Sequence, residues 1–124
     1  MPDEPIRIVI IEDNKVFREA LELLLGLRDG LVVVGSIADG EKAVDACRRL
    51  QPDVALMDYR LPGLDGAAAT RAVIEASGAA VLCLTAEANA EEREEILRAG
   101  AVGLVEKGGT LDGLAEAIRG AVPG

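Results

Sequence analysis

Short apolar runs alternate along this chain with stretches in which apolar residues recur at helical spacing. The apolar runs occupy residues 6–11, 31–35, 54–57, 80–84 and 102–106, and each has the length of one buried strand. The stretch after the first run predicts a helix with an apolar face formed by Phe17, Ala20, Leu21, Leu24 and Leu27. Five strand and helix pairs in series predict a single α/β domain, a doubly wound (βα)5 fold with a parallel sheet covered on both faces.

The other helices are indicated by their spacing and by their capping residues. The second has a stripe of apolar residues, namely Ala43, Val44, Cys47 and Leu50. The third is a stretch of high helix propensity from Ala67 to Ala76, which follows a turn predicted at Leu61-Pro62-Gly63. Asn89 can cap a fourth helix that runs to Gly100, and Thr110 can cap a fifth. The fifth helix has an apolar stripe at Leu111, Leu114, Ala115, Ile118 and Val122.

Polar residues follow four of the five predicted strands at the point where each strand ends. Glu12 and Asp13 follow the first strand, Asp58 the third, Thr85 the fourth and Lys107 the fifth. The carboxyl ends of parallel strands lie along one edge of the sheet, and ligands bind there where the strand order reverses. In the flavodoxin-like order 2-1-3-4-5, strands one and three flank that point, so the three carboxylates should converge in one cleft.

This combination of side chains favours a cation and a phosphoryl group. Clustered carboxylates repel one another, and oxygen ligands without His or Cys favour Mg²⁺ over zinc. The chain contains no histidine, which also excludes histidine-based catalysis. A lysine and a threonine opposite a carboxylate supply a charge and a hydroxyl donor for a phosphoryl group. A carboxylate can itself be the nucleophile that forms an acyl phosphate.

Each of these residues also has an ordinary explanation when it is taken alone. Asp58 after a strand is often a cap or a turn former, and Thr85 is more often a capping hydroxyl. Lys107 alone is more often a solvated charge, and the Glu12-Asp13 pair alone is a weak signal. Their joint placement at four separate strand ends favours a functional site.

Composition narrows the classes of partner. The chain has 22 acidic and 13 basic residues and a net charge of −9, which disfavours binding to nucleic acid or to an anionic membrane surface. No apolar run has the length of a membrane span, and no signal peptide is evident, so we expect a cytoplasmic location. Cys47 and Cys83 have no disulfide or metal-binding pattern, and Cys83 lies in an apolar run typical of the core.

Four segments of the chain resemble the signature segments of response-regulator receiver domains of two-component systems: IVIIEDN, VALMDYRLPGLDG, VLCLTA and GLVEKGG. The resemblance implies a phosphoprotein in signal transduction that accepts a phosphoryl group on Asp58. It further implies that Asp13, Asp58 and the backbone carbonyl of Arg60 bind Mg²⁺, with Glu12 acting through water. Thr85 and Lys107 would contact the phosphoryl group. The donor would be a sensor histidine kinase, which fits the absence of histidine from this chain.

A narrower resemblance links the chain to receivers of the NarL/FixJ group. It rests on the segments NKVFREAL and KGGTL. Receivers of this group usually precede a DNA-binding domain that regulates transcription. Residues 1–124 correspond to the receiver domain alone, so the chain is either a fragment or a stand-alone regulator. In this family kinases dock on the exposed edge of the first helix, which here lies near Lys15, Arg18 and Glu19, while Phe17 could be core or contact.

Two residues depart from the family pattern. Most receivers have Tyr or Phe three residues before the lysine, where this chain has Leu104, and most have Pro where this chain has Gly108. Without the aromatic residue, we expect phosphorylation to act through shifts of the fourth helix, the fifth strand and the fifth helix. A change on that face can drive homodimerisation.

Three other functions share parts of this pattern. A flavodoxin-like electron carrier would need a flavin phosphate loop where the acids stand, and a phosphohydrolase would need an acid where Arg60 stands. A pseudo-receiver would keep the fold without phosphorylation, but the acid set is intact. No GxGxxG or Walker A loop occurs in the sequence, so nucleotide binding has no support.

Overall fold

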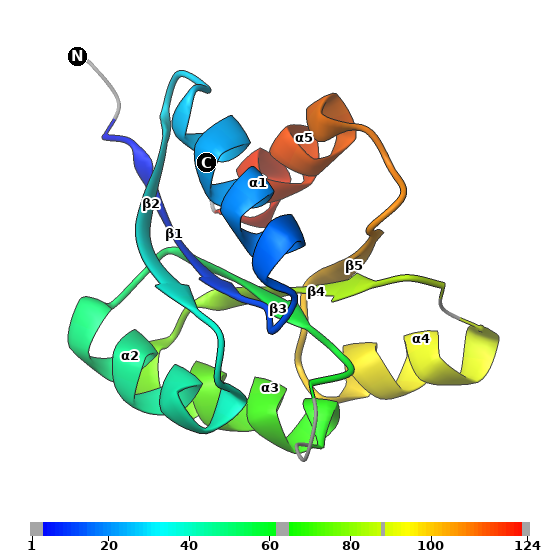
Figure 1. Ribbon diagram of the computed structural model, residues 1–124. Coiled ribbons are helices and arrows are strands. Elements are labelled where there is room, and N and C mark those ends of the chain that lie inside the picture. The colour runs from blue at the N-terminus through cyan, green and yellow to red at the C-terminus, as the bar shows by residue number, and fades with distance from the viewer. Residues whose placement is uncertain (1–3, 62–64, 88, 123–124) are drawn as a thin grey trace.

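The computed structural model describes residues 4–61, 65–87 and 89–122 (Figure 1). Its five strands are β1 (Ile6–Ile11), β2 (Leu31–Ile37), β3 (Val54–Asp58), β4 (Ala80–Thr85) and β5 (Gly103–Glu106). They alternate with α1 (Lys15–Gly26), α2 (Ala43–Leu50), α3 (Gly66–Ser77), α4 (Ala90–Arg98) and α5 (Leu111–Ala121), and a short 3-10 turn, η1 (Gly40–Lys42), precedes α2. All neighbouring strands pair in parallel in the order β2-β1-β3-β4-β5, which confirms the predicted fold.

The sheet separates two apolar cores, one on each face. Helices α1 and α5 cover one face, and α2, α3 and α4 cover the other (Figure 1). Successive strand residues point to opposite faces, so Val9 and Ile11 of β1 belong to the α2–α4 core while Ile8 and Ile10 belong to the α1–α5 core. The central strands are therefore apolar on both sides, which explains why their sequences read as continuous apolar runs.

The helix starts are fixed by side-chain caps. Asn89 accepts a hydrogen bond from the Glu92 amide, and Thr110 accepts one from the Gly113 amide, so both predicted caps are confirmed. Asn14 caps α1 in the same way. The predicted turn at residues 61–63 lies mostly outside the described residues.

The predicted apolar face of the first helix is partly wrong. Leu21 and Leu25 of α1 are buried, whereas Leu24 and Leu27 are exposed. The inward stripe runs at i, i+4 and i+8 from Phe17, which is half-buried against the same core. Three neighbouring leucines make both stripes compatible with helical spacing, and only the packing on the sheet selects one.

Both cysteines are buried in the described part of the chain and form no disulfide, as expected. Cys83 lies in β4 with its side chain in the α2–α4 core. Among the described residues, no helix is both long and apolar enough to cross a membrane.

The parallel register brings the predicted polar residues to one edge of the sheet. Met57 of β3 pairs with Ile11 of β1, and Asp58 pairs with Leu84 of β4. The strands thus end at nearly the same level. Asp58 and Thr85, the last residues of β3 and β4, share this edge with Glu12 and Lys107, which directly follow β1 and β5.

Candidate functional site

Three carboxylates meet where β1 and β3 end. One oxygen from each of Glu12, Asp13 and Asp58 lies within 4.8 Å of the others. Glu12 is fully buried, Asp58 is 6% exposed and Asp13 is open to solvent. The set combines a closed side, formed by protein, with an open side from which a ligand can approach.

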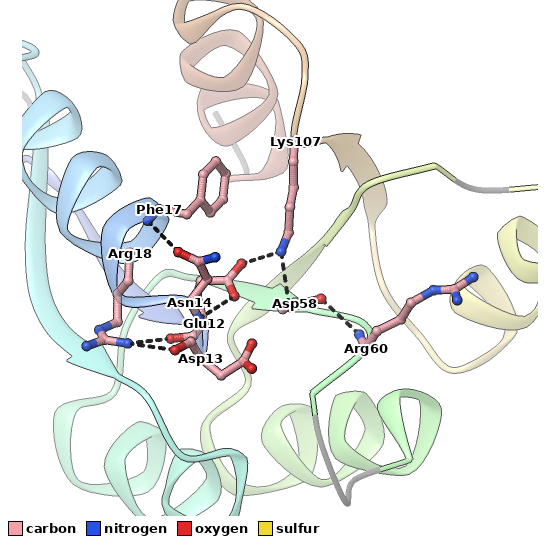
Figure 2. Close-up of polar contacts among 8 residues, drawn as sticks. All are labelled: Glu12, Asp13, Asn14, Phe17, Arg18, Asp58, Arg60 and Lys107. Atoms are coloured by element: carbon pink, nitrogen blue, oxygen red, sulfur yellow. Dashed lines mark hydrogen bonds and ion pairs between the residues drawn. The ribbon is translucent and has the colours of Figure 1, made fainter.

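Lys107 joins two of these carboxylates from the end of β5 (Figure 2). Its Nζ lies 2.5 Å from Oε1 of Glu12 and 3.0 Å from Oδ2 of Asp58. Burial alone would lower the pKa of Lys107, but its contacts with the Glu12 and Asp58 carboxylates outweigh burial and raise that pKa. The amine is therefore a permanent positive charge within the cluster.

Glu12 is held by both of its carboxylate oxygens. Oε2 accepts a hydrogen bond of 3.0 Å from the Asn14 amide, and Oε1 faces Lys107. Burial raises the pKa of Glu12, and the charge of Asp58 adds to this effect, while Lys107 and the Asn14 amide oppose it. A second cation at the site would favour the ionised form further.

Asp58 is fixed by the backbone that follows it. The Arg60 amide donates to Oδ1 of Asp58 at 2.9 Å, and the Tyr59 amide donates to the Leu84 carbonyl at 3.0 Å. Gly66, the first residue of α3, leaves room for this segment, because a Cβ there would lie 2.7 Å from the Tyr59 ring. Burial, together with the nearby Glu95 carboxylate, raises the pKa of Tyr59.

Thr85 completes the set at the end of β4. Its Oγ1 is buried and finds no hydrogen-bond partner within the described ranges, and its carbonyl accepts a bond of 2.8 Å from the Lys107 amide. A buried hydroxyl without a partner is costly, so this hydroxyl, next in the chain to the strand partner of Asp58, is a candidate contact for a ligand.

The structure also reveals contacts that the sequence pattern did not signal. The ring of Phe17 lies 5.1 Å from Nζ of Lys107, and the guanidinium of Arg18 donates to the carbonyls of Glu12 and Asp13 (Figure 2). Nothing in helical spacing or strand-end position distinguishes these two residues from neighbours on the same turn.

Two further residues were singled out by the sequence. Arg60 directs its side chain away from Asp58 (Figure 2). Its guanidinium forms an ion pair with Glu92 of α4. Leu104, which stands where most receivers have an aromatic residue, is half-buried and packs against the α2–α4 core.

These groups fit a hard cation and a phosphoryl group together. The exposed Asp13 and the nearby carboxylate of Asp58 supply oxygen ligands of the type that Mg²⁺ prefers. Lys107 and the buried hydroxyl of Thr85 lie on the β4 and β5 side, where they can stabilise phosphoryl oxygens.

Comparison with known proteins agrees with this chemistry. The family model for the response regulator receiver domain matches residues 8–119. The response regulator GacA of Pseudomonas viridiflava is 35% identical over 115 residues, which are 92% of this chain and 54% of that protein. The transcriptional regulatory protein DegU of Brevibacillus brevis is 35% identical over 118 residues, 94% of this chain and 50% of that protein.

Solved structures give the same result. The signal receiver domain of NarL from Mycobacterium tuberculosis is 32% identical, with a TM-score of 0.84 over 95% of this chain and 99% of that one. The segments NKVFREAL and KGGTL likewise resemble receivers of the NarL/FixJ group. The chain spans about half the length of the curated relatives it matches. This chain belongs to the family of response-regulator receiver domains.

Proposed function

We propose that this chain is a phosphoacceptor switch in which Asp58 takes a phosphoryl group from a sensor histidine kinase in a Mg²⁺-dependent reaction. Receiver domains bind Mg²⁺ at an acidic pocket, and the cluster of Glu12, Asp13 and Asp58 supplies one here. The observation that carries the proposal is the position of Lys107, 3.0 Å from Asp58, together with a buried Thr85 hydroxyl on the neighbouring strand that has no hydrogen-bond partner among the described residues.

Each residue then has a distinct role. A carboxylate oxygen of Asp58 attacks phosphorus, the phosphorus–nitrogen bond of the donor phosphohistidine breaks, and the imidazole nitrogen retains the electron pair. Asp13, Asp58 and the Arg60 carbonyl would hold Mg²⁺, with Glu12 acting through water. The cation supplies charge neutralisation at the transferring phosphoryl oxygens. Lys107 and Thr85 stabilise the remaining oxygens.

The partner surface in this proposal is the outer side of α1. Val16 of this helix and its C-cap residue Leu27 are 81% and 74% exposed, and Leu23 lies between them on the same side. Apolar residues gathered on one exposed helix face are typical of a protein contact. This agrees with kinase docking on the first helix, where Lys15, Arg18 and Glu19 were expected to contribute.

The output surface in this proposal comprises α4, β5 and α5. Only Ile96 of α4 is buried, and Leu97 is exposed, so this helix is weakly anchored and can shift. Leu104 has no ring or hydroxyl to report phosphorylation, so coupling would run through the backbone. We include three further points in this proposal. The chain forms homodimers, it regulates transcription through a further domain, and it acts in the cytoplasm.

The test is labelling with a small phosphodonor. Incubation with acetyl phosphate and Mg²⁺ should add one phosphoryl mass that hydroxylamine removes, and omission of Mg²⁺ or the Asp58→Asn substitution should abolish the addition. Asp53→Asn is the matched control, because Asp53 precedes the same strand at its opposite end. Labelling that persists in Asp58→Asn would refute the proposal.

A further inference from the structure

The first turn of α1 lies against both halves of the site. Arg18 contacts the loop that carries Glu12 and Asp13, while the preceding residue, Phe17, contacts Lys107 on the opposite side of the acids (Figure 2). Neither residue belongs to the set that binds metal or phosphoryl in the proposed function.

The guanidinium of Arg18 bonds to the backbone carbonyls of the loop that carries Glu12 and Asp13. Its Nη1 donates to the Glu12 carbonyl at 2.8 Å and reaches the Asp13 carbonyl at 3.5 Å. The Glu12 amide is bonded at the same time to the Ile37 carbonyl of β2 at 2.9 Å. Bonds on both sides of one residue fix its peptide planes, and therefore the direction in which the Glu12 and Asp13 side chains leave the loop.

Phe17 supports the lysine from the α1 side. The face of an aromatic ring attracts a cation within about 6 Å of its centroid, and Nζ of Lys107 lies at 5.1 Å. Phe17 is itself packed on the α1–α5 core, so its ring is a fixed surface. The amine of Lys107 is thus confined by Glu12, Asp58 and an aromatic face.

We infer that Phe17 and Arg18 are positioning residues, with Arg18 orienting the metal-binding acids and Phe17 orienting the phosphoryl-binding lysine. The inference rests on the proposed function, because it assigns Mg²⁺ and phosphoryl to these two halves. It makes the first turn of α1 part of the site although neither side chain touches the reacting atoms.

The Arg18 half is tested by Mg²⁺ binding, because two explanations predict opposite signs. Loss of a positive charge near three carboxylates should tighten cation binding. Loss of the hydrogen bonds from Arg18 to the loop carbonyls should weaken it. We expect Arg18→Gln to raise the Mg²⁺ dissociation constant about three- to tenfold in a calorimetric titration. Lys15→Gln removes the same charge from the same turn, where Lys15 pairs with exposed Glu19, and should not raise that constant.

A metal-free measurement accompanies the titration. The amide of Asn14, which bonds the Glu12 carboxylate, should exchange faster in Arg18→Gln than in Lys15→Gln, and Arg18→Lys should lie between them. If Arg18→Gln binds Mg²⁺ as tightly as Lys15→Gln does, and if its Asn14 amide exchanges at the same rate, the proposed role of Arg18 is wrong. A parent chain that binds no Mg²⁺ would refute the proposed metal site, while the exchange rates would still decide the loop contact.

The Phe17 half is tested by the rate of phosphorylation. Phe17→Leu keeps an apolar side chain but removes the aromatic face, and acetyl phosphate at saturating Mg²⁺ should label it about two- to fivefold more slowly than the parent. Phe17→Tyr restores the face and should react faster than Phe17→Leu. Equal rates for the leucine variant and the parent, at equal stability to urea, would overturn this role.

Discussion

Replacement of Lys107 by methionine should destabilise the fold in a manner that depends on pH and on Mg²⁺. Lys107 is 24% exposed and is the cation between the carboxylates of Glu12 and Asp58. Methionine keeps most of the apolar stem but removes the charge, so fully buried Glu12 loses its ionic partner. Removal of one partner from a buried ion pair costs about 3–5 kcal/mol in the free energy of unfolding.

Protonation of Glu12 sets a ceiling on this loss. An ordinary glutamate has a pKa of 4.5, so protonation at pH 7 costs about 1.4 kcal/mol for each of about 2.5 pH units, or roughly 3.4 kcal/mol. Partial exposure of Lys107 lowers the loss further, and we expect about 2–3 kcal/mol at pH 7.

The sign of the pH dependence follows from the raised pKa of Glu12. Above pH 4.5 the unfolded state has released the proton that the variant's folded state retains, so the unfolded state binds fewer protons and stability falls as pH rises. The deficit of Lys107→Met should therefore shrink as pH is lowered from 7 towards 4.5. Without the charge of Lys107, the three carboxylates should bind Mg²⁺ more tightly than they do in the parent, so added Mg²⁺ should stabilise the variant more than the parent and reduce the deficit.

Urea unfolding followed by circular dichroism measures these differences. Lys15→Met is the control, because it makes the same replacement at an exposed lysine and should change stability by less than about 0.5 kcal/mol. A Lys107→Met variant as stable as the parent without Mg²⁺ would refute the electrostatic role of Lys107. A deficit independent of pH and Mg²⁺ would instead indicate lost packing against Phe17.

Other substitutions test the packing around the site. Gly66→Ala should cost at least about 2 kcal/mol in urea unfolding because its methyl group meets Tyr59, whereas Gly120→Ala points into open space on α5 and should be neutral or stabilise by up to about 1 kcal/mol. Leu25→Ala should cost about 2–5 kcal/mol, while Leu27→Ala, at the exposed C-cap of α1, should cost less than about 0.5 kcal/mol; similar losses would contradict the assigned inner face. Burial raises the pKa of both cysteine thiols from 9.0 to about 11, so the native protein should react slowly with a disulfide reagent at pH 8, and stability should fall between pH 9 and 11 because the unfolded thiols release their protons first; rapid native labelling would contradict this.

The sheet and the strand-end residues could be predicted because the rules behind them depend on position along the chain. Apolar runs that are buried on both faces have a simple pattern, and parallel strands must end at a common edge. Glu12, Asp58, Thr85 and Lys107 therefore lie together in the structure as the sequence indicated. The predicted strands needed only small corrections, such as the extension of β2 to Ile37.

The face of α1 and the roles of its first turn could not be predicted in the same way. The leucines near the end of α1 fit more than one apolar stripe at helical spacing, namely Leu23, Leu24, Leu25 and Leu27. Which of them are buried depends on how the helix is rotated over the sheet. The contact of Phe17 with Lys107 joins residues far apart in the chain, and the contact of Arg18 with the nearby Glu12 carbonyl depends on side-chain direction; helical spacing determines neither.

The chemical identity of the modified residue tests the central claim most directly. Borohydride reduces an aspartyl phosphate to homoserine, so treatment of the acetyl phosphate product followed by peptide mass spectrometry locates the acyl phosphate. The account predicts homoserine at position 58 in the chain treated with Mg²⁺ and acetyl phosphate, and an unaltered aspartate there when Mg²⁺ is withheld. Reduction at Asp13 or Glu12 instead, or at no residue of a fully folded chain, would contradict it.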